Sequence, residues 1–114
     1  MTAPDTDLTA RLAFLTEADR LKLVDRASRI TNNTRCENSA EHSWHLALYA
    51  LVLGDLAGPG VSTDRVIRMM LLHDLVEIDA GDVPIHSAAG QAHASEATKA
   101  AELAGAERIF GLLP

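Results

Sequence analysis

The sequence predicts an all-α domain with about five helices, on three observations. Apolar residues recur at three- and four-residue steps, no stretch alternates as a strand would, and Ala and Leu, both strong helix formers, are abundant. Of the 114 residues, 47% are apolar but only 4% are aromatic, so the core must consist of Leu, Ala, Val, Ile and Met. A chain of this length is expected to form a single domain, residues 1–114, with one modest core.

The N-terminal third contains two predicted helices. The first has apolar residues spaced for one helical face at Leu8, Leu12 and Leu15. Thr16-Glu17-Ala18-Asp19 resembles a capping sequence, which predicts a second, short helix through Val24. The periodicity then fails between Ser28 and Asn38, where polar residues predict a loop.

Three further helices follow. Ser39 is the expected N-cap of the first, which should end at Gly58-Pro59-Gly60; its stripe comprises His42, His45, Leu46, Tyr49, Leu53 and Leu56. Ser62 or Thr63 should start the next helix, with Gly81 as its C-cap; its inner stripe comprises Val66, Met69, Met70, His73, Val76 and Glu77. An Ala-rich helix is expected from about Ser95 to Phe110.

Charge and cysteine content exclude several classes of function. The formal net charge of −6 argues against nucleic-acid polymers and anionic membranes, which attract clustered Lys and Arg. A small phosphorylated substrate remains compatible, because a bound cation and a few arginines can invert the local field. The single cysteine, Cys36, excludes an internal disulfide and a Cys-rich zinc site. The longest apolar run, Leu46–Leu53, is too short to span a bilayer and no leader opens the chain, so we expect a cytoplasmic protein.

Two histidines and an aspartate are candidate ligands of a divalent metal ion. His42 and His73 lie within apolar stripes of consecutive predicted helices, and Asp74 lies mid-helix among leucines and valine. A single buried histidine is often a core residue bonded to a carbonyl group. Two at matched positions favour a shared ion, and a buried carboxylate costs several kcal/mol unless a cation or strong donors accompany it. The sequence therefore predicts a metal held by His42, His73 and Asp74.

Two acidic residues follow at functional spacing. Glu77 lies one helical turn beyond His73 and Asp74, where it could pair with a protonated His73 or act as a general base that orients a water. Asp82 could be a second catalytic group or merely cap the turn before Pro84. Both alternatives remain open on spacing alone.

These residues stand in motifs that resemble the HD-domain phosphohydrolases, most closely the branch of bacterial 5'-deoxynucleotidases. The motifs are Arg35-Cys36-Glu37-Asn38-Ser39-Ala40-Glu41-His42-Ser43-Trp44-His45, Met70-Leu71-Leu72-His73-Asp74-Leu75-Val76-Glu77 and Ala80-Gly81-Asp82. The resemblance implies an HD-domain helical bundle, usually dimeric. It also implies that His42, His73 and Asp74 bind a divalent ion (Mn, Co, Zn, Ni, Fe or Mg), that Glu77 activates water, that Arg26 binds substrate phosphate, and that Asp82 lines the sugar side of the pocket.

The implied function is metal-dependent hydrolysis of a phosphomonoester, of a nucleotide or a similar small molecule. Two departures accompany the resemblance: no aspartate follows Asp82, although the family completes its metal set with a later one, and Ala27 replaces a tryptophan linked to sugar selection. The alternative is therefore a truncated, catalytically impaired HD-fold binding module. Because the apolar stripes match a domain with further helices, we also expect a homo-oligomer that covers them.

Overall fold

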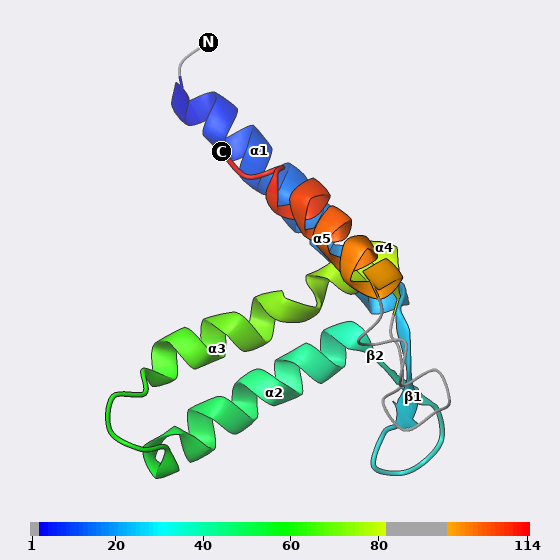
Figure 1. Ribbon diagram of the computed structural model, residues 1–114, viewed down its shortest axis with the longest axis vertical. Helices are drawn as coiled ribbons and strands as arrows, with labels where there is room; N and C mark the ends of the chain where they lie inside the picture. The colour runs from blue at the N-terminus through cyan, green and yellow to red at the C-terminus, as the bar shows by residue number, and fades with distance from the viewer. Residues whose placement is uncertain (1–2, 82–95) are drawn as a thin grey trace.

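The computed structural model describes residues 3–81 and 96–114, and helices make up most of them (Figure 1). The elements are α1 (Ala3–Ala18), the 3-10 turn η1 (Asp19–Leu23), β1 (Asp25–Arg29), β2 (Cys36–Asn38), α2 (Ser39–Leu53), η2 (Gly54–Leu56), α3 (Thr63–Leu72), η3 (His73–Val76), α4 (Glu77–Ala80) and α5 (Glu96–Phe110). The predicted helical fold is thereby confirmed. Within these ranges, none of the helices combines the length and the apolar character that crossing a bilayer demands.

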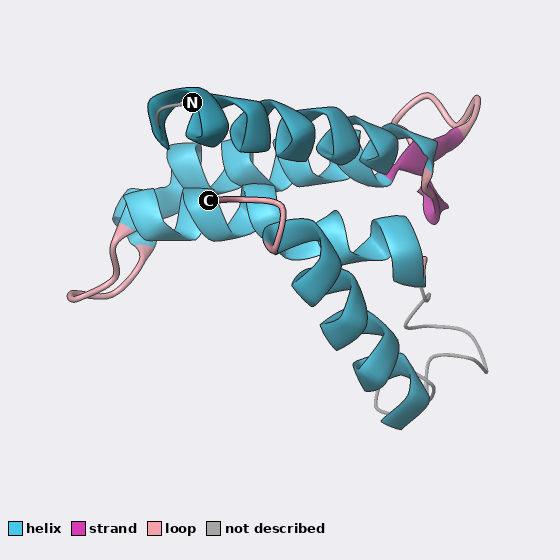
Figure 2. Ribbon diagram, turned by 90° about the horizontal axis from the view of Figure 1, so that it is seen from above, coloured by secondary structure: helices cyan, strands magenta, loops and turns pink. Residues whose placement is uncertain are grey.

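A small β-hairpin interrupts the helical pattern, so the expectation of a chain without strands was wrong. β1 and β2 pair antiparallel, with Asp25 opposite Asn38 and Arg29 opposite Cys36, and the unequal spacing introduces a bulge. Figure 2 shows both strands at one edge of the otherwise helical molecule. β1 is largely solvent-exposed and has the sequence Asp-Arg-Ala-Ser-Arg. It therefore carries no apolar alternation from which a strand could be predicted.

The hairpin loop is closed by polar residues. Asn33 adopts the left-handed conformation, with φ of 61°, and its N–H donates to the carbonyl of Ile30 at 2.8 Å. The Asn32 side chain accepts hydrogen bonds from the N–H and the hydroxyl of Thr34. Asparagine tolerates the left-handed region better than most residues, which explains a tight turn without glycine.

Several helix boundaries differ from those predicted. Thr16 starts no new helix, because α1 continues through it and Ala18 keeps helical φ and ψ angles into η1. Asn38, not Ser39, caps α2. α2 ends at Leu53, before Gly58-Pro59-Gly60, and a 3-10 turn completes the segment. Ser62 caps α3 and Gly81 follows α4 with φ of 76°, both as expected.

The core lies between α1, η1, η3 and α5. Its buried members are Phe14, Leu21, Leu75 and Ile109. The rings of Phe14 and Phe110 pack with centroids 6.0 Å apart, which joins the first helix to the last. The segment that contains His73 and Asp74 is thus anchored to the core through Leu75.

Two features hold α5 against that segment. A Cβ atom on Gly105 would lie 3.0 Å from the Val76 carbonyl oxygen, so glycine permits the close approach of α5 to η3. Arg108 donates to Asp79 at 2.6 and 2.9 Å and to Glu17 at 2.8 Å, which links α5 to α4 and α1. The guanidinium group lowers the pKa of both carboxyls below their ordinary values.

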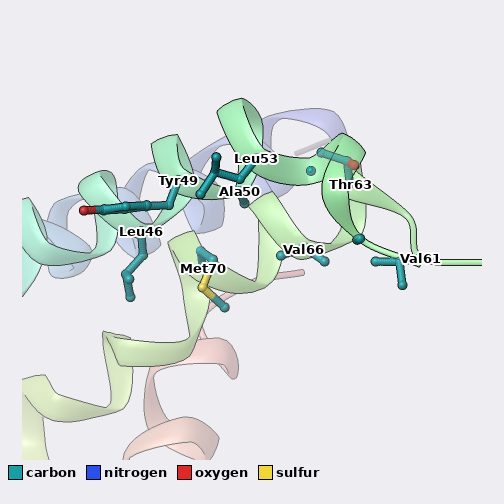
Figure 3. A pocket seen from close by; sticks show the side chains of 10 residues that line it. Leu46, Tyr49, Ala50, Leu53, Val61, Thr63, Val66 and Met70 are labelled. Carbon is teal, nitrogen blue, oxygen red and sulfur yellow. The ribbon is translucent and has the colours of Figure 1, made fainter. Parts of the chain in front are cut away.

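α2 and α3 form a helical hairpin that extends away from the α1–α5 pair (Figure 1). The two predicted stripes meet in part between these helices, where an apolar cavity of about 330 Å³ lies (Figure 3). Its lining includes Leu46, Tyr49 and Leu53 from α2 and Val66 and Met70 from α3. The stripes are not buried as a core, however. Tyr49 and Leu53 are 53% and 48% exposed.

Ile109→Ala tests the location of the core. Ile109 is fully buried on α5, so truncation should lower the free energy of unfolding by about 2–5 kcal/mol, the usual cost of a core aliphatic. Leu103→Ala on the same helix, where the side chain is 62% exposed, is the matched control and should change stability little. Chemical denaturation of both variants makes the comparison, and equal losses would contradict this core.

The exposed apolar side chains of α2 and α3 bear on the oligomeric state, which remains a prediction. Leu51, Val52 and Met69 are each at least 60% exposed. Because apolar area left in water forgoes about 25 cal/mol per Å², we expect a homodimer or higher oligomer. Light scattering measures the mass in solution. A thermally stable monomer at high micromolar concentration would contradict this expectation.

Candidate metal centre

The N-terminus of α2 is fixed by a reciprocal capping box. The Glu41 N–H donates to Asn38 Oδ1 at 2.9 Å, and the Asn38 N–H donates to Glu41 Oε1 at 2.8 Å. Arg35 holds the same carboxylate from the preceding loop, with Nη2 2.9 Å from Glu41 Oε2. Three interactions therefore determine where α2 begins, and with it the place of His42 one residue later.

The buried side of α2 is built from small residues. Ser39, Ser43 and Ala47 follow one another at four-residue steps, and all are at most 9% exposed. Small side chains let the helix approach the rest of the molecule closely, and α2 contacts both η1 and η3. His42 thus lies on a helix packed against the turn that carries His73 and Asp74.

η3 differs from the continuous helix that the sequence predicted. The α-helix ends at Leu72, and His73–Val76 form a 3-10 turn before α4 begins at Glu77. Residues three apart lie over one another in such a turn. Asp74 and Glu77 are therefore directed to the same side, and each side chain is only 14% exposed.

The His73–Asp74 pair has the donor arrangement of a metal site. His73 Nδ1 lies 3.0 Å from the Met70 carbonyl oxygen, which can only accept, so Nδ1 carries the proton. In the neutral ring, Nε2 then presents a lone pair to Asp74 Oδ1 at 3.1 Å. Two ligand atoms that share one ion through bonds of about 2.1 Å lie about 3.0–3.4 Å apart. The 3.1 Å contact fits an ion pair of a ring that carries a second proton, and it equally fits two atoms that share a metal ion.

Asp74 is also incompletely satisfied. Its Oδ2 atom is buried and has no hydrogen-bond partner in residues 3–81 and 96–114. A buried carboxylate oxygen without a donor costs free energy that a bound cation would recover. The predicted burial of this carboxylate is confirmed, although its neighbours Leu71 and Leu72 are 48% and 43% exposed.

His42 is oriented by Glu37. Its Nδ1 atom lies 2.8 Å from Glu37 Oε1, and both side chains are half-buried. Because a carboxylate accepts, Nδ1 carries the proton and Nε2 keeps a lone pair for a metal. Carboxylates in this position commonly orient metal-binding histidines.

Arg26 lies between two of the acidic residues. Its Nε atom is 3.8 Å from Glu37 Oε1, and its Nη1 atom is 3.7 Å from Glu77 Oε1. The strand β1 thus brings the candidate phosphate-binding arginine beside the candidate general base. A cavity of about 400 Å³, lined in part by Glu37, Trp44 and His45, opens beside this group.

The structure gathers these residues only in part. It brings Arg26 to Glu77 and His73 to Asp74, while His42 pairs with Glu37. Within the two described ranges, no three His, Cys, Asp or Glu side chains form a ready metal-binding group. The ligand set His42, His73 and Asp74 stays a prediction, and Asp82 lies outside the described residues.

Sequence reasoning assigned no role to Glu37. A signal was nevertheless present: in a helix capped by Asn38 and Glu41, the residue before the cap and the fourth helical residue meet, and these are Glu37 and His42. Apolar residues usually occupy this pair of positions. An acid and a histidine in their place indicate a polar contact.

A comparison with known protein families gives the wider context. The profile of the HD domain matches residues 18–114, which is most of the chain. The chain belongs to the HD domain family. The match includes every residue assigned above to the candidate metal centre.

Three proteins with similar sequences or structures illustrate the family. The 5'-deoxynucleotidase YfbR of Shigella flexneri and the 5'-deoxynucleotidase plu3092 of Photorhabdus laumondii are each 29% identical over 105 residues, 89% of this chain. The chain spans about half the length of these relatives, 52% and 53% respectively. A solved structure, a predicted metal-dependent phosphohydrolase from Magnetospirillum magnetotacticum MS-1, superposes with a TM-score of 0.88 at 42% identity. The superposition includes 99% of this chain and 54% of the solved chain.

The Arg35–Glu41 pair gives the start of α2 a defined pH dependence. Arg35 and the Asn38 N–H lower the pKa of Glu41 from 4.5 to about 2. Since the folded pKa is depressed, the stabilisation is present above pH 4.5 and is lost as the pH falls towards 2.

Glu41→Gln keeps the capping box but removes the charge. Its Tm should therefore lie below that of the wild type at neutral pH, and the gap should close on acidification. Thermal unfolding at several pH values between neutral and acidic pH measures this difference in Tm, with Glu107→Gln, at an exposed position, as the control. A gap that does not depend on pH would contradict the assignment.

Proposed function

We propose that this HD domain is a metal-dependent phosphohydrolase that cleaves a phosphomonoester, with a nucleoside monophosphate or a similar small molecule as substrate. The observation that carries the proposal is the contact between His73 Nε2 and Asp74 Oδ1, two atoms that both accept when the ring is neutral and whose spacing suits two ligands of one ion. The HD domain match and the similarity to a predicted metal-dependent phosphohydrolase support the same chemistry.

The residues present fit a divalent cation. Asp74 offers a buried carboxylate oxygen without a donor in the described ranges, and His42 and His73 each have Nδ1 bonded to an acceptor, which leaves Nε2 available. Imidazole nitrogen and carboxylate oxygen are ligands that zinc, manganese and cobalt accept. When bound, such an ion would supply positive charge to a phosphate oxygen and lower the pKa of water.

The chain's own groups then have distinct roles. Arg26 would neutralise a phosphate oxygen, and its proximity to Glu77 would place that phosphate beside a carboxylate. Glu77 would accept a hydrogen bond from the attacking water, orient it and take its proton. Asp82 is proposed, on the resemblance alone, to face the sugar.

Release of inorganic phosphate tests the activity. A malachite-green assay compares nucleoside monophosphates as substrates with Mn²⁺, Co²⁺ or Zn²⁺ added, for the wild type and for His73→Ala. We expect metal-dependent release that His73→Ala abolishes. Metal binding without any release of phosphate would instead favour the alternative, a catalytically impaired HD-fold binding module.

Glu77→Gln separates the role of water activation from metal binding. Glu77 contacts Arg26 and lies one turn beyond Asp74, so the amide should keep the metal stoichiometry. Turnover should fall by roughly a hundredfold or more, the usual scale for a lost general base. Metal analysis and steady-state kinetics on the same preparation measure both quantities. Loss of metal together with activity would make Glu77 a ligand instead.

A further inference from the structure

Glu37 is a carboxylate that contacts two proposed functional residues at once. A single oxygen, Oε1, lies 2.8 Å from His42 Nδ1 and 3.8 Å from Arg26 Nε. The side chain is 16% exposed, so water screens these contacts poorly. Glu37 therefore joins a candidate metal ligand to the candidate phosphate-binding arginine.

Backbone geometry dictates both contacts. Asp25 pairs with Asn38 across the hairpin, and Arg26 and Glu37 are their neighbours in the chain, so the two strands bring these side chains near each other. The capping box at Asn38 places Glu37 immediately before the cap and His42 at the fourth helical position, two positions that meet at a capped N-terminus. Glu37 thus lies where the hairpin and α2 converge.

The contact with His42 decides which ring nitrogen can bind a metal. With Glu37 as acceptor, the proton stays on Nδ1 and the lone pair on Nε2. Without this acceptor, the two neutral tautomers would compete and the ring could rotate. Part of the population would then present a protonated Nε2, which cannot bind a metal ion.

Glu37 forms an ion pair with Arg26 on the Nε side of the guanidinium group, at 3.8 Å, and Glu77 forms one at Nη1, at 3.7 Å. A long arginine side chain otherwise loses considerable rotamer entropy when it binds phosphate. Two fixed carboxylates reduce that loss by restricting the side chain beforehand.

We propose that Glu37 is a positioning residue that fixes the His42 tautomer for metal binding and orients Arg26 for phosphate binding, so that one carboxylate couples the two subsites. The proposal rests on the proposed ligand role of His42. Glu37 itself touches neither metal nor substrate in this scheme.

Calorimetric titration of the metal-free protein with Co²⁺ is the first test. Glu37→Ala should weaken Co²⁺ binding about 10–100-fold, as removal of the carboxylate behind a metal-binding histidine usually does. Glu37→Gln should fall between Glu37→Ala and the wild type, because its amide oxygen still accepts the Nδ1 proton but carries no charge. Glu107→Gln, the same chemical change at an exposed position on α5, should bind as the wild type does.

Co²⁺ binding to His42→Ala and the Tm of metal-free Glu37→Ala distinguish the possible outcomes. If Co²⁺ binds the wild type and Glu37→Ala equally while His42→Ala binds weakly, the positioning role is wrong and the ligand role of His42 stands. If His42→Ala also binds normally, the proposed ligand set itself fails. If Glu37→Ala lowers the Tm of the metal-free protein but leaves Co²⁺ affinity unchanged, Glu37 is merely structural and the inference is overturned.

Inhibition by inorganic phosphate tests the coupling. Glu37→Ala should raise the inhibition constant for phosphate. The double variant Arg26→Ala/Glu37→Ala should have the same inhibition constant as Arg26→Ala alone, because the arginine is the group through which Glu37 acts on phosphate. Co²⁺ is kept saturating for each variant, so that weaker metal binding does not enter the comparison. Independent, additive effects of the two substitutions would contradict the coupling.

Discussion

The candidate centre depends on carboxylates that are largely withdrawn from water. Glu37, Asp74 and Glu77 are each at most 16% exposed, and Arg26 contacts two of them. Asp74 has the adjacent His73 imidazole at one oxygen, and no hydrogen-bond partner at the other within residues 3–81 and 96–114. Ionised carboxylates in such surroundings are costly without a compensating cation. If this group binds a cation, the electrostatic repulsion that opposes folding is relieved, and the relief adds to the affinity for the ion.

The junction between the hairpin and α2 determines how that charge is arranged. The strand register sets Arg26 against Glu37, and the Asn38 capping box sets Glu37 against His42. On the opposite side, Leu75 anchors the His73–Asp74 turn in the core, where Gly105 lets α5 approach it. Two rigid supports, one local in sequence and one long-range, thus hold the two halves of the centre. A change in either support should act on the site without touching a ligand.

Sequence patterns predicted the helical fold and, through the resemblance, a divalent metal ion, while the ligand set stays a prediction. The spacing of Ser62, Gly81 and the Ala-rich segment predicted helix ends within a few residues, because capping and propensity are local properties. The hairpin could not be predicted, since the exposed β1 gives no alternation and its pairing joins residues that are 7 (Arg29 and Cys36) to 13 (Asp25 and Asn38) positions apart. The buried core was also misplaced. Tyr49 and Leu53 of the α2 stripe and Met69 of the α3 stripe remain exposed, and small residues such as Ser43, not the large apolar ones, form the buried side of α2.

The metal content of the protein, purified without chelators and measured by mass spectrometry, tests the central claim most directly. A site formed by His42, His73 and Asp74 predicts about one divalent ion per chain in the wild type, the stoichiometry of a single-ion centre. Asp74→Ala should lower the content to background, while Asp55→Asn, an exposed carboxylate in η2, should leave it unchanged. A wild type without bound metal that also takes up none on dialysis against Mn²⁺, Co²⁺ or Zn²⁺ would contradict the account. Equal metal content in the wild type and Asp74→Ala would contradict it as well.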